Sequence, residues 1–136
     1  MILYLDASAL VKRYVAEPGS DPVRRAMRDA DGWFMCRVGY VETLRAVGLA
    51  AGRSAARRVR EEWGSMGVIE VDHRLADEAA ELTLTYDLRS LDALHLASAK
   101  LLPSADLVVA TWDRRLHTAT VAVGLRVLPE SPPPTG

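Results

Sequence analysis

The sequence predicts an α/β fold in which a mostly parallel sheet of four to five strands is flanked by helices on both faces. Two observations support this fold class. Apolar runs of three to five residues alternate along the chain with longer segments whose apolar residues recur at helical spacing. In parallel sheets, helices connect one strand to the next and cover the sheet, which gives this alternation.

The predicted strands are short, and most of them consist of apolar residues. They are Ile2–Leu5, Trp33–Cys36, Val68–Val71, Leu107–Ala110 and Arg126–Leu128. The run at 107–110, Leu-Val-Val-Ala, is the clearest buried strand of the set.

The predicted helices begin at residues that favour a helix start. The first follows Asp6, with Ser8 as an early cap, and a second starts at Ser20 or Asp21. Further helices are expected at about Val38–Ala51, from Ser54, at about Arg74–Tyr86 after Asp72, at Leu91–Leu102 and after Asp113. Val41 and Leu44 are expected on the apolar face of the third, and Leu91 and Leu101 on that of the helix 91–102.

Length and composition indicate one domain at residues 1–129, followed by a proline-rich tail, 130–136, without fixed structure. Hydrophobic residues make up 49% of the chain, which is ordinary globular usage. A sole cysteine, Cys36, excludes an internal disulfide, and the start of the chain lacks the features of a signal peptide. No apolar run is long enough to span a membrane, so we expect a cytoplasmic protein with no membrane contact.

The overall charge of −1 does not decide whether the chain binds nucleic acid. Its cations are almost all arginine, whose rigid fork of donors matches phosphate, although the base composition of the gene would explain the same bias. If four carboxylates bind metal, the remaining residues carry +3.

Four acids are the candidate site. Asp6 and Asp113 each follow a buried strand, where parallel sheets bind ligands, although either alone would suit a helix cap. Glu42 lies close to the buried face of an apolar helix, where a carboxylate needs a cation or hydrogen-bond donors. Asp92 lies in the first turn of a helix, where it also complements the helix dipole.

Carboxylates this close together would repel one another unless a cation neutralised them. Oxygen ligands suit Mg²⁺ or Mn²⁺, and the sequence offers no histidine or cysteine cluster for zinc. A carboxylate-bound divalent cation indicates phosphoryl chemistry, because it activates water and stabilises charge on phosphate.

Four motifs follow one another along the chain: Leu-Asp-Ala-Ser-Ala-Leu-Val-Lys-Arg-Tyr from Leu5, Tyr40-Val-Glu42, Leu91-Asp-Ala-Leu-His-Leu-Ala and Thr111-Trp-Asp-Arg-Arg-Leu. Together they resemble the PIN-domain nucleases, especially the VapC toxins of prokaryotic toxin–antitoxin pairs. The resemblance covers Met1 to about Pro129 and implies a PIN-like three-layer sandwich.

The resemblance implies an endoribonuclease that depends on Mg²⁺ or Mn²⁺. It makes Asp6, Glu42, Asp92 and Asp113 the metal-binding and catalytic acids, with Ser8 and Thr111 as the hydroxyls that support them. It also implies a structured RNA substrate such as tRNA or rRNA, a VapB-like antitoxin and a homodimer, for which the helix face Val41–Ala51 is a candidate contact.

Other polar residues near the motifs are weaker candidates. Lys12, Arg13, Arg114 and Arg115 are possible RNA contacts, since each lies within about two helical turns of a predicted ligand. His95 shares a helix face with Asp92 but is expected to be structural.

Two alternatives remain at this stage. The chain could be a catalytically silent PIN-like module that binds RNA or an antitoxin without cleavage, which the four intact acids disfavour. It could also be a phosphotransfer domain, but Ser8 stands where such a domain would want a second acid.

Overall fold

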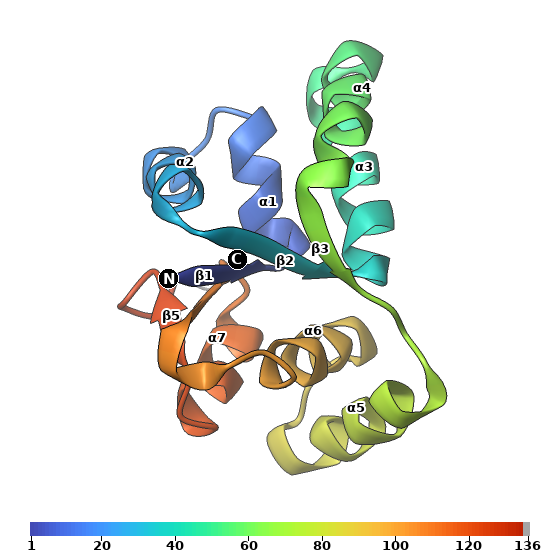
Figure 1. Ribbon diagram of the computed structural model, residues 1–136, viewed down its shortest axis with the longest axis vertical. Helices are drawn as coiled ribbons and strands as arrows, with labels where there is room; N and C mark the ends of the chain where they lie inside the picture. Colours follow the sequence, from blue (N-terminus) through green and yellow to red (C-terminus); the bar gives the residue numbers. More distant parts are fainter. Residues whose placement is uncertain (135–136) are drawn as a thin grey trace.

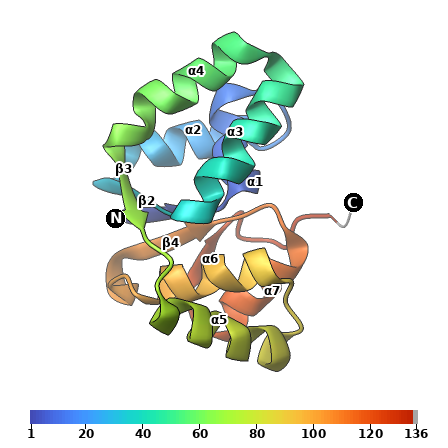
Figure 2. The same ribbon diagram turned by 90° about the vertical axis from the view of Figure 1, so that its right-hand side faces the viewer.

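A parallel sheet divides the molecule into two layers of helices (Figures 1 and 2). The computed structural model describes residues 1–134, which contain five strands in the order β3-β2-β1-β4-β5, all parallel to their neighbours. In Figure 2, α1–α4 lie above the sheet and α5–α7 below it. The predicted α/β class and three-layer arrangement are therefore confirmed.

The strands are β1 (Ile2–Leu5), β2 (Gly32–Cys36), β3 (Met66–Ile69), β4 (Leu107–Ala110) and β5 (Arg126–Leu128). The helices are α1 (Ala7–Tyr14), α2 (Ser20–Asp29), α3 (Arg37–Ala51), α4 (Arg53–Glu62), α5 (His73–Tyr86), α6 (Ser90–Lys100) and α7 (Arg114–Ala122). The order of elements follows the prediction, but β3 begins two residues earlier than expected.

Strand β1 lies at the centre of the sheet and pairs with both β2 and β4. Its last residue, Leu5, pairs with Ala110, the last residue of β4. Asp6 and Thr111, which follow these two strands, are therefore brought to the same edge of the sheet. A parallel sheet binds ligands at this edge, and the candidate site lies there.

Two expected helix faces are confirmed only in part. In α3, Val47 is buried on the expected face, but the other buried residues are Gly39 and Thr43, and Val41 is 66% exposed. The cause is close packing on β2, since a Cβ at Gly39 would lie 2.6 Å from atoms of Met35. In α6, Ala97 and Ser98 are buried on the expected face, but Leu91, and Leu101 just after the helix, are exposed, and the burial extends to the side of Asp92 and His95.

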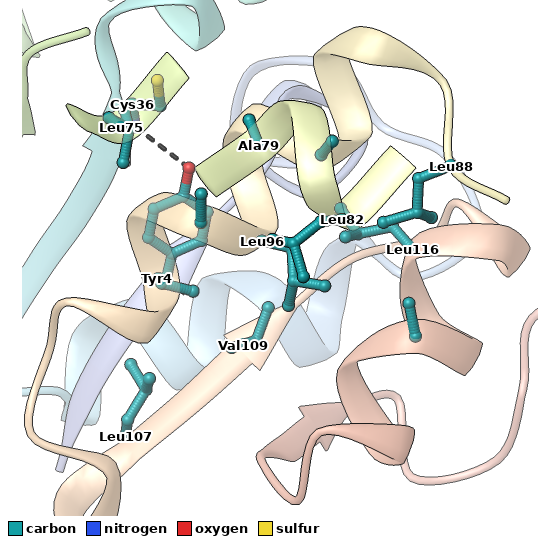
Figure 3. Close-up of a cluster of buried hydrophobic side chains, with 14 residues drawn as sticks. Tyr4, Cys36, Leu75, Ala79, Leu82, Leu88, Leu96, Leu107, Val109 and Leu116 are labelled. Atoms are coloured by element: carbon teal, nitrogen blue, oxygen red, sulfur yellow. Dashed lines mark hydrogen bonds between the residues drawn. The ribbon is translucent and has the colours of Figure 1, made fainter. Parts of the chain in front are cut away.

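Each face of the sheet has its own apolar core. Side chains from α1, α2 and the strands fill the upper one, including Leu3, Leu10 and Met35. The lower core, drawn in Figure 3, contains leucines and alanines of α5, α6 and α7 around Tyr4 of β1. Tyr4 is the polar member of that core, and its hydroxyl accepts a hydrogen bond from the backbone of Cys36.

The segment after β5 lies against the helices, at least as far as residue 134. Pro133 is buried, and its carbonyl accepts a 3.0 Å hydrogen bond from Arg114. The division into a domain at 1–129 and a tail without fixed structure at 130–136 stays a prediction, and residues 135–136 lie outside the described part of the chain. Between residues 1 and 134, none of the helices has the length and apolar character that crossing a membrane requires.

Candidate active site

All four predicted acids line one hollow at the carboxyl ends of β1 and β4. The hollow measures about 360 Å³. Its lining residues are Asp6, Ala7, Ser8, Glu42, Arg89, Ser90, Leu91, Asp92, His95 and Asp113. Acids separated by more than a hundred residues in sequence thus meet around a single space.

Asp6 is the most buried of the four acids, with 4% of its surface exposed. Its Oδ1 caps α1 by accepting a 2.9 Å hydrogen bond from the backbone N–H of Ala9, so Asp6 and not Ser8 is the helix cap. Burial raises the pKa of Asp6 above its usual value, although it accepts several hydrogen bonds. A bound cation would relieve that cost of burying the charge.

Two hydroxyls fix Asp6 against the neighbouring strand end. Ser8 donates to Oδ1 of Asp6 at 2.7 Å and accepts from the backbone of Trp112 at 2.8 Å. Thr111 donates to Oδ2 of Asp6 and accepts from the backbone of Asp113 at 3.1 Å. Each hydroxyl therefore links the segment after β1 to the segment after β4. These contacts agree with the expectation that Ser8 and Thr111 lie beside the acids and support them.

Asp113 and Asp92 are joined by a residue that the sequence analysis did not single out. Arg89 donates from Nε to Asp92 at 3.1 Å and from an Nη atom to Oδ2 of Asp113. Asp113 also caps α7 through its Oδ1, which accepts from the backbone of Leu116 at 3.0 Å. Burial, and then the Asp113 charge, raise the pKa of Asp92, and Arg89 opposes that rise.

Glu42 is held by a hydrogen-bonded chain that runs into the core. Nε2 of His95 lies 2.8 Å from Glu42 Oε1, and Nδ1 lies 2.7 Å from the Tyr4 hydroxyl. An ionised Glu42 can only accept, so we assign the His95 hydrogen to Nε2, and Nδ1 then accepts from Tyr4. His95 is 2% exposed and bonded at both nitrogens, which agrees with its expected structural role.

The donor set suits a hard divalent cation, because it consists of carboxylate oxygens with hydroxyls close by. As the side chains stand, however, residues 1–134 contain no group of three His, Cys, Asp or Glu side chains arranged to hold a metal. The Arg89 guanidinium bridges two of the acids instead. A cation bound between Asp92 and Asp113 would have to take the place of this guanidinium.

The four cations predicted to contact RNA differ in exposure and in the partners that they already have within the protein. Lys12 is buried and pairs with Glu17 at 2.9 Å, and Arg114 donates to the Pro133 carbonyl. Arg13 pairs with Glu62 but also lines an open hollow, and Arg115 is exposed. The geometry thus favours Arg13 and Arg115 over the other two.

Tyr4 and Arg89 are the site residues that sequence reasoning missed. For each of them, the sequence contains a feature that could have indicated a role in the site. Tyr4 is a polar residue inside an otherwise apolar strand, and such a hydroxyl needs a buried partner. Arg89 precedes Asp92 by three residues at a helix start, where a cation opposes the helix dipole unless acids surround it.

Comparison with known proteins gives the class of this fold and site. The family model for the PIN domain matches residues 3–121, and the chain therefore belongs to the PIN-domain family. Within it, the chain is 38% identical over 130 residues to ribonuclease VapC46 of Mycobacterium tuberculosis, covering 95% of this chain and 98% of that protein. It is also 35% identical to ribonuclease VapC45 from the same species, over 94% and 95% of the two chains.

Solved structures agree on the fold. The crystal structure of M. tuberculosis VapC20, described as a Sarcin-Ricin loop cleaving toxin, has a TM-score of 0.75 at 16% identity and covers 96% of this chain and 99% of its own. A toxin–antitoxin complex from Klebsiella pneumoniae has a TM-score of 0.72 at 15% identity, with coverage of 95% and 98%. The resemblance to PIN-domain VapC proteins inferred from the four motifs is thus confirmed.

Proposed function

We propose that this chain is an endoribonuclease that hydrolyses phosphodiester bonds in RNA with the help of Mg²⁺ or Mn²⁺, and that it is the toxin of a VapBC-type pair. The observation that carries the proposal is the hollow that Asp6, Glu42, Asp92 and Asp113 line together. The relatives at 35–38% identity are named ribonucleases, which supports the same reaction here.

The four acids would hold the cation, which when bound supplies a water of lowered pKa and stabilises charge on the scissile phosphate. Ser8 and Thr111 keep Asp6 fixed while the charge in the hollow changes. His95 binds one oxygen of Glu42, and within residues 1–134 the other oxygen has no hydrogen bond. That second oxygen is suited to bind the cation or to accept a proton from the attacking water.

The distribution of charge supports RNA lying against α1 and α2 and not against α5–α7. Helices α1 and α2 contain five Lys and Arg residues and two acids, whereas α5–α7 contain four of each. The acidic hollow cannot attract a polyanion by itself, so phosphates away from the cleaved bond need these cations. One such place is a hollow of about 440 Å³ lined by Arg13, Arg24, Arg28, Trp33 and Arg58.

RNA cleavage by the purified chain, free of antitoxin, tests the proposal. Total RNA is incubated with Mg²⁺ or Mn²⁺ and the wild type, Asp6→Asn, or Asp77→Asn, which changes an exposed acid of α5. We expect Asp6→Asn to lose at least about 100-fold in rate, as removal of key electrostatic groups commonly does, and Asp77→Asn to match the wild type. Cleavage that survives EDTA, or an active Asp6→Asn, would contradict the metal-carboxylate mechanism.

We further propose that the antitoxin binds a groove between α3 and α4, and that the segment bound there is acidic and amphipathic. The groove measures about 660 Å³, and its apolar residues include Val41 and Leu49, which are 66% and 72% exposed. Four arginines also line it: Arg45, Arg53, Arg57 and Arg60. Within the described residues none of the four forms an ion pair, so acidic side chains of a partner have cations to meet.

The homodimer remains a prediction, and its expected surface overlaps this groove. A second copy bound through Val41–Ala51 would bring two sets of groove arginines together, and their repulsion disfavours that contact. The cytoplasmic location and the choice of tRNA or rRNA as substrate also remain predictions.

A further inference from the structure

Arg89 stands out because it is the strongest cation among the described residues that line the acidic hollow. It lies at the N-cap position of α6, where its side chain makes no capping hydrogen bond. Its guanidinium instead spans Asp92 and Asp113. The hydrogen bond to Asp92 is also the main reason why the pKa of Arg89 is raised.

Most hydrogen bonds that the site acids accept come from donors that cannot easily leave. Asp6 is bound by Ser8, Thr111 and a backbone N–H, all in buried or partly buried surroundings. Glu42 is bound by His95, which is 2% exposed. Leaving any of these donors buried without a partner would cost the free energy of removing it from water.

Arg89 differs from those donors in exposure. Its side chain is 66% exposed, whereas the side chains of Asp92 and Asp113 are 12% and 21% exposed. The guanidinium can therefore rotate into water without being left buried and unpaired. Among the donors bonded to the site acids, Arg89 is thus the one whose departure costs least, and it frees two of the four acids.

We propose that Arg89 is a positioning residue that competes with the divalent cation: it neutralises Asp92 and Asp113 in the metal-free protein and is displaced when the cation binds. This inference rests on the proposed metal-dependent function. The competition raises the apparent Kd for the cation by the reciprocal of the fraction of molecules in which Arg89 leaves the acids free. If nine molecules in ten are so occupied, the apparent Kd for the cation is about tenfold higher than without Arg89.

Whether removal of Arg89 strengthens or weakens metal binding distinguishes a competing Arg89 from one that only supports the acids. A purely structural Arg89 would hold the acids in place for the cation, so removing it would weaken metal binding. If Arg89 competes with the cation, removing it would strengthen metal binding. The measurement is therefore the Kd for Mn²⁺ in the absence of RNA, which does not depend on catalysis.

The experiment titrates the EDTA-treated, dialysed full chain with MnCl₂ and follows free Mn²⁺ by electron paramagnetic resonance. The variant is Arg89→Gln, and the matched control is Arg37→Gln, because Arg37 also makes two contacts to a carboxylate, Glu70, at an exposed position outside the hollow. We expect Arg89→Gln to bind Mn²⁺ about tenfold more tightly and Arg37→Gln to stay within about twofold of the wild type.

An unchanged or weaker affinity of Arg89→Gln would overturn the proposal, as would the absence of Mn²⁺ binding by both wild type and variant. Thermal melting gives a second measure: without metal Arg89→Gln should melt below the wild type, and Mn²⁺ should raise its Tm by more. If Arg89→Gln binds Mn²⁺ tightly but the wild type cuts no RNA, the competition stands and the ribonuclease function fails.

Discussion

The acidic hollow and the groove between α3 and α4 use charge in opposite ways. In the hollow, protein donors already occupy the acids, and the strand ends on either side are linked through Ser8 and Thr111. In the groove, four arginines surround exposed apolar side chains and, within residues 1–134, make no ion pair. The first arrangement fixes geometry for chemistry, and the second leaves charge available for a partner.

The largest expected effect tests whether the two regions act independently. Replacing Arg53 and Arg57 by glutamate together should weaken binding of the antitoxin by about 100-fold, because each reversal turns an attraction into a repulsion. Isothermal titration of each variant with the cognate antitoxin measures this loss, with Arg25→Glu on α2 as control. RNA cleavage by the double variant should stay within about threefold of the wild type; loss of cleavage with intact antitoxin binding would show that the groove serves RNA instead.

An intermediate effect concerns the rigidity of the hollow. Thr111→Val keeps the shape of the side chain but leaves Asp6 and the backbone of Asp113 without their shared hydroxyl. We expect a loss of about 2 kcal/mol in the free energy of unfolding, measured in urea. Thr118→Val, at an exposed position of α7, should change it by less than about 0.5 kcal/mol. Equal effects of the two variants would mean that the hydroxyl link contributes little.

The smallest effect is a contrast in pH dependence between an acid of the hollow and an acid of α4. Hydrogen bonds from Arg13 lower the pKa of Glu62, so this carboxylate stabilises the fold above about pH 4 and loses that contribution as pH falls further. Glu62→Gln should therefore cost about 1 kcal/mol at pH 7 and almost nothing near pH 2. Urea unfolding at both pH values measures this difference.

For Asp92 we expect the opposite change of stability with pH. Because its pKa is raised, the fold favours the neutral acid, and this favourable contribution is lost as pH rises through the raised pKa. In EDTA at pH 7, Asp92→Asn should therefore stabilise the chain, by about 1 kcal/mol, and the gain should vanish below about pH 4. A destabilised Asp92→Asn at pH 7 would mean that the ion pair with Arg89 outweighs burial.

Most of the fold followed from the sequence, since the apolar runs gave the positions of the strands and turn residues separated the helices. Which faces of α3 and α6 are buried followed only in part. The burial of α3 depends on how closely Gly39 approaches Met35, a tertiary distance that helical periodicity does not contain. In α6, site chemistry overrides hydrophobicity, because Asp92 and His95 are buried while Leu91 and Leu101 face water.

The acids of the candidate site were predictable because strand ends and motifs mark them individually. The contacts between them were not. Arg89 meets Asp113, 24 residues away, and His95 meets Glu42, 53 residues away, so neither pair appears as a local pattern. Tyr4 was hidden for the same reason, since its partners lie on β2 and α6.

The pairing of β1 with β4 has a consequence for synthesis. Asp6 and Glu42 leave the ribosome early, but β1 finds β4, and Asp113 with it, only after more than a hundred residues have been made. A growing chain can pair β1 with β2 and β3 while its cutting centre is still incomplete. The topology thus delays completion of the acidic hollow until β4 and Asp113 have been made.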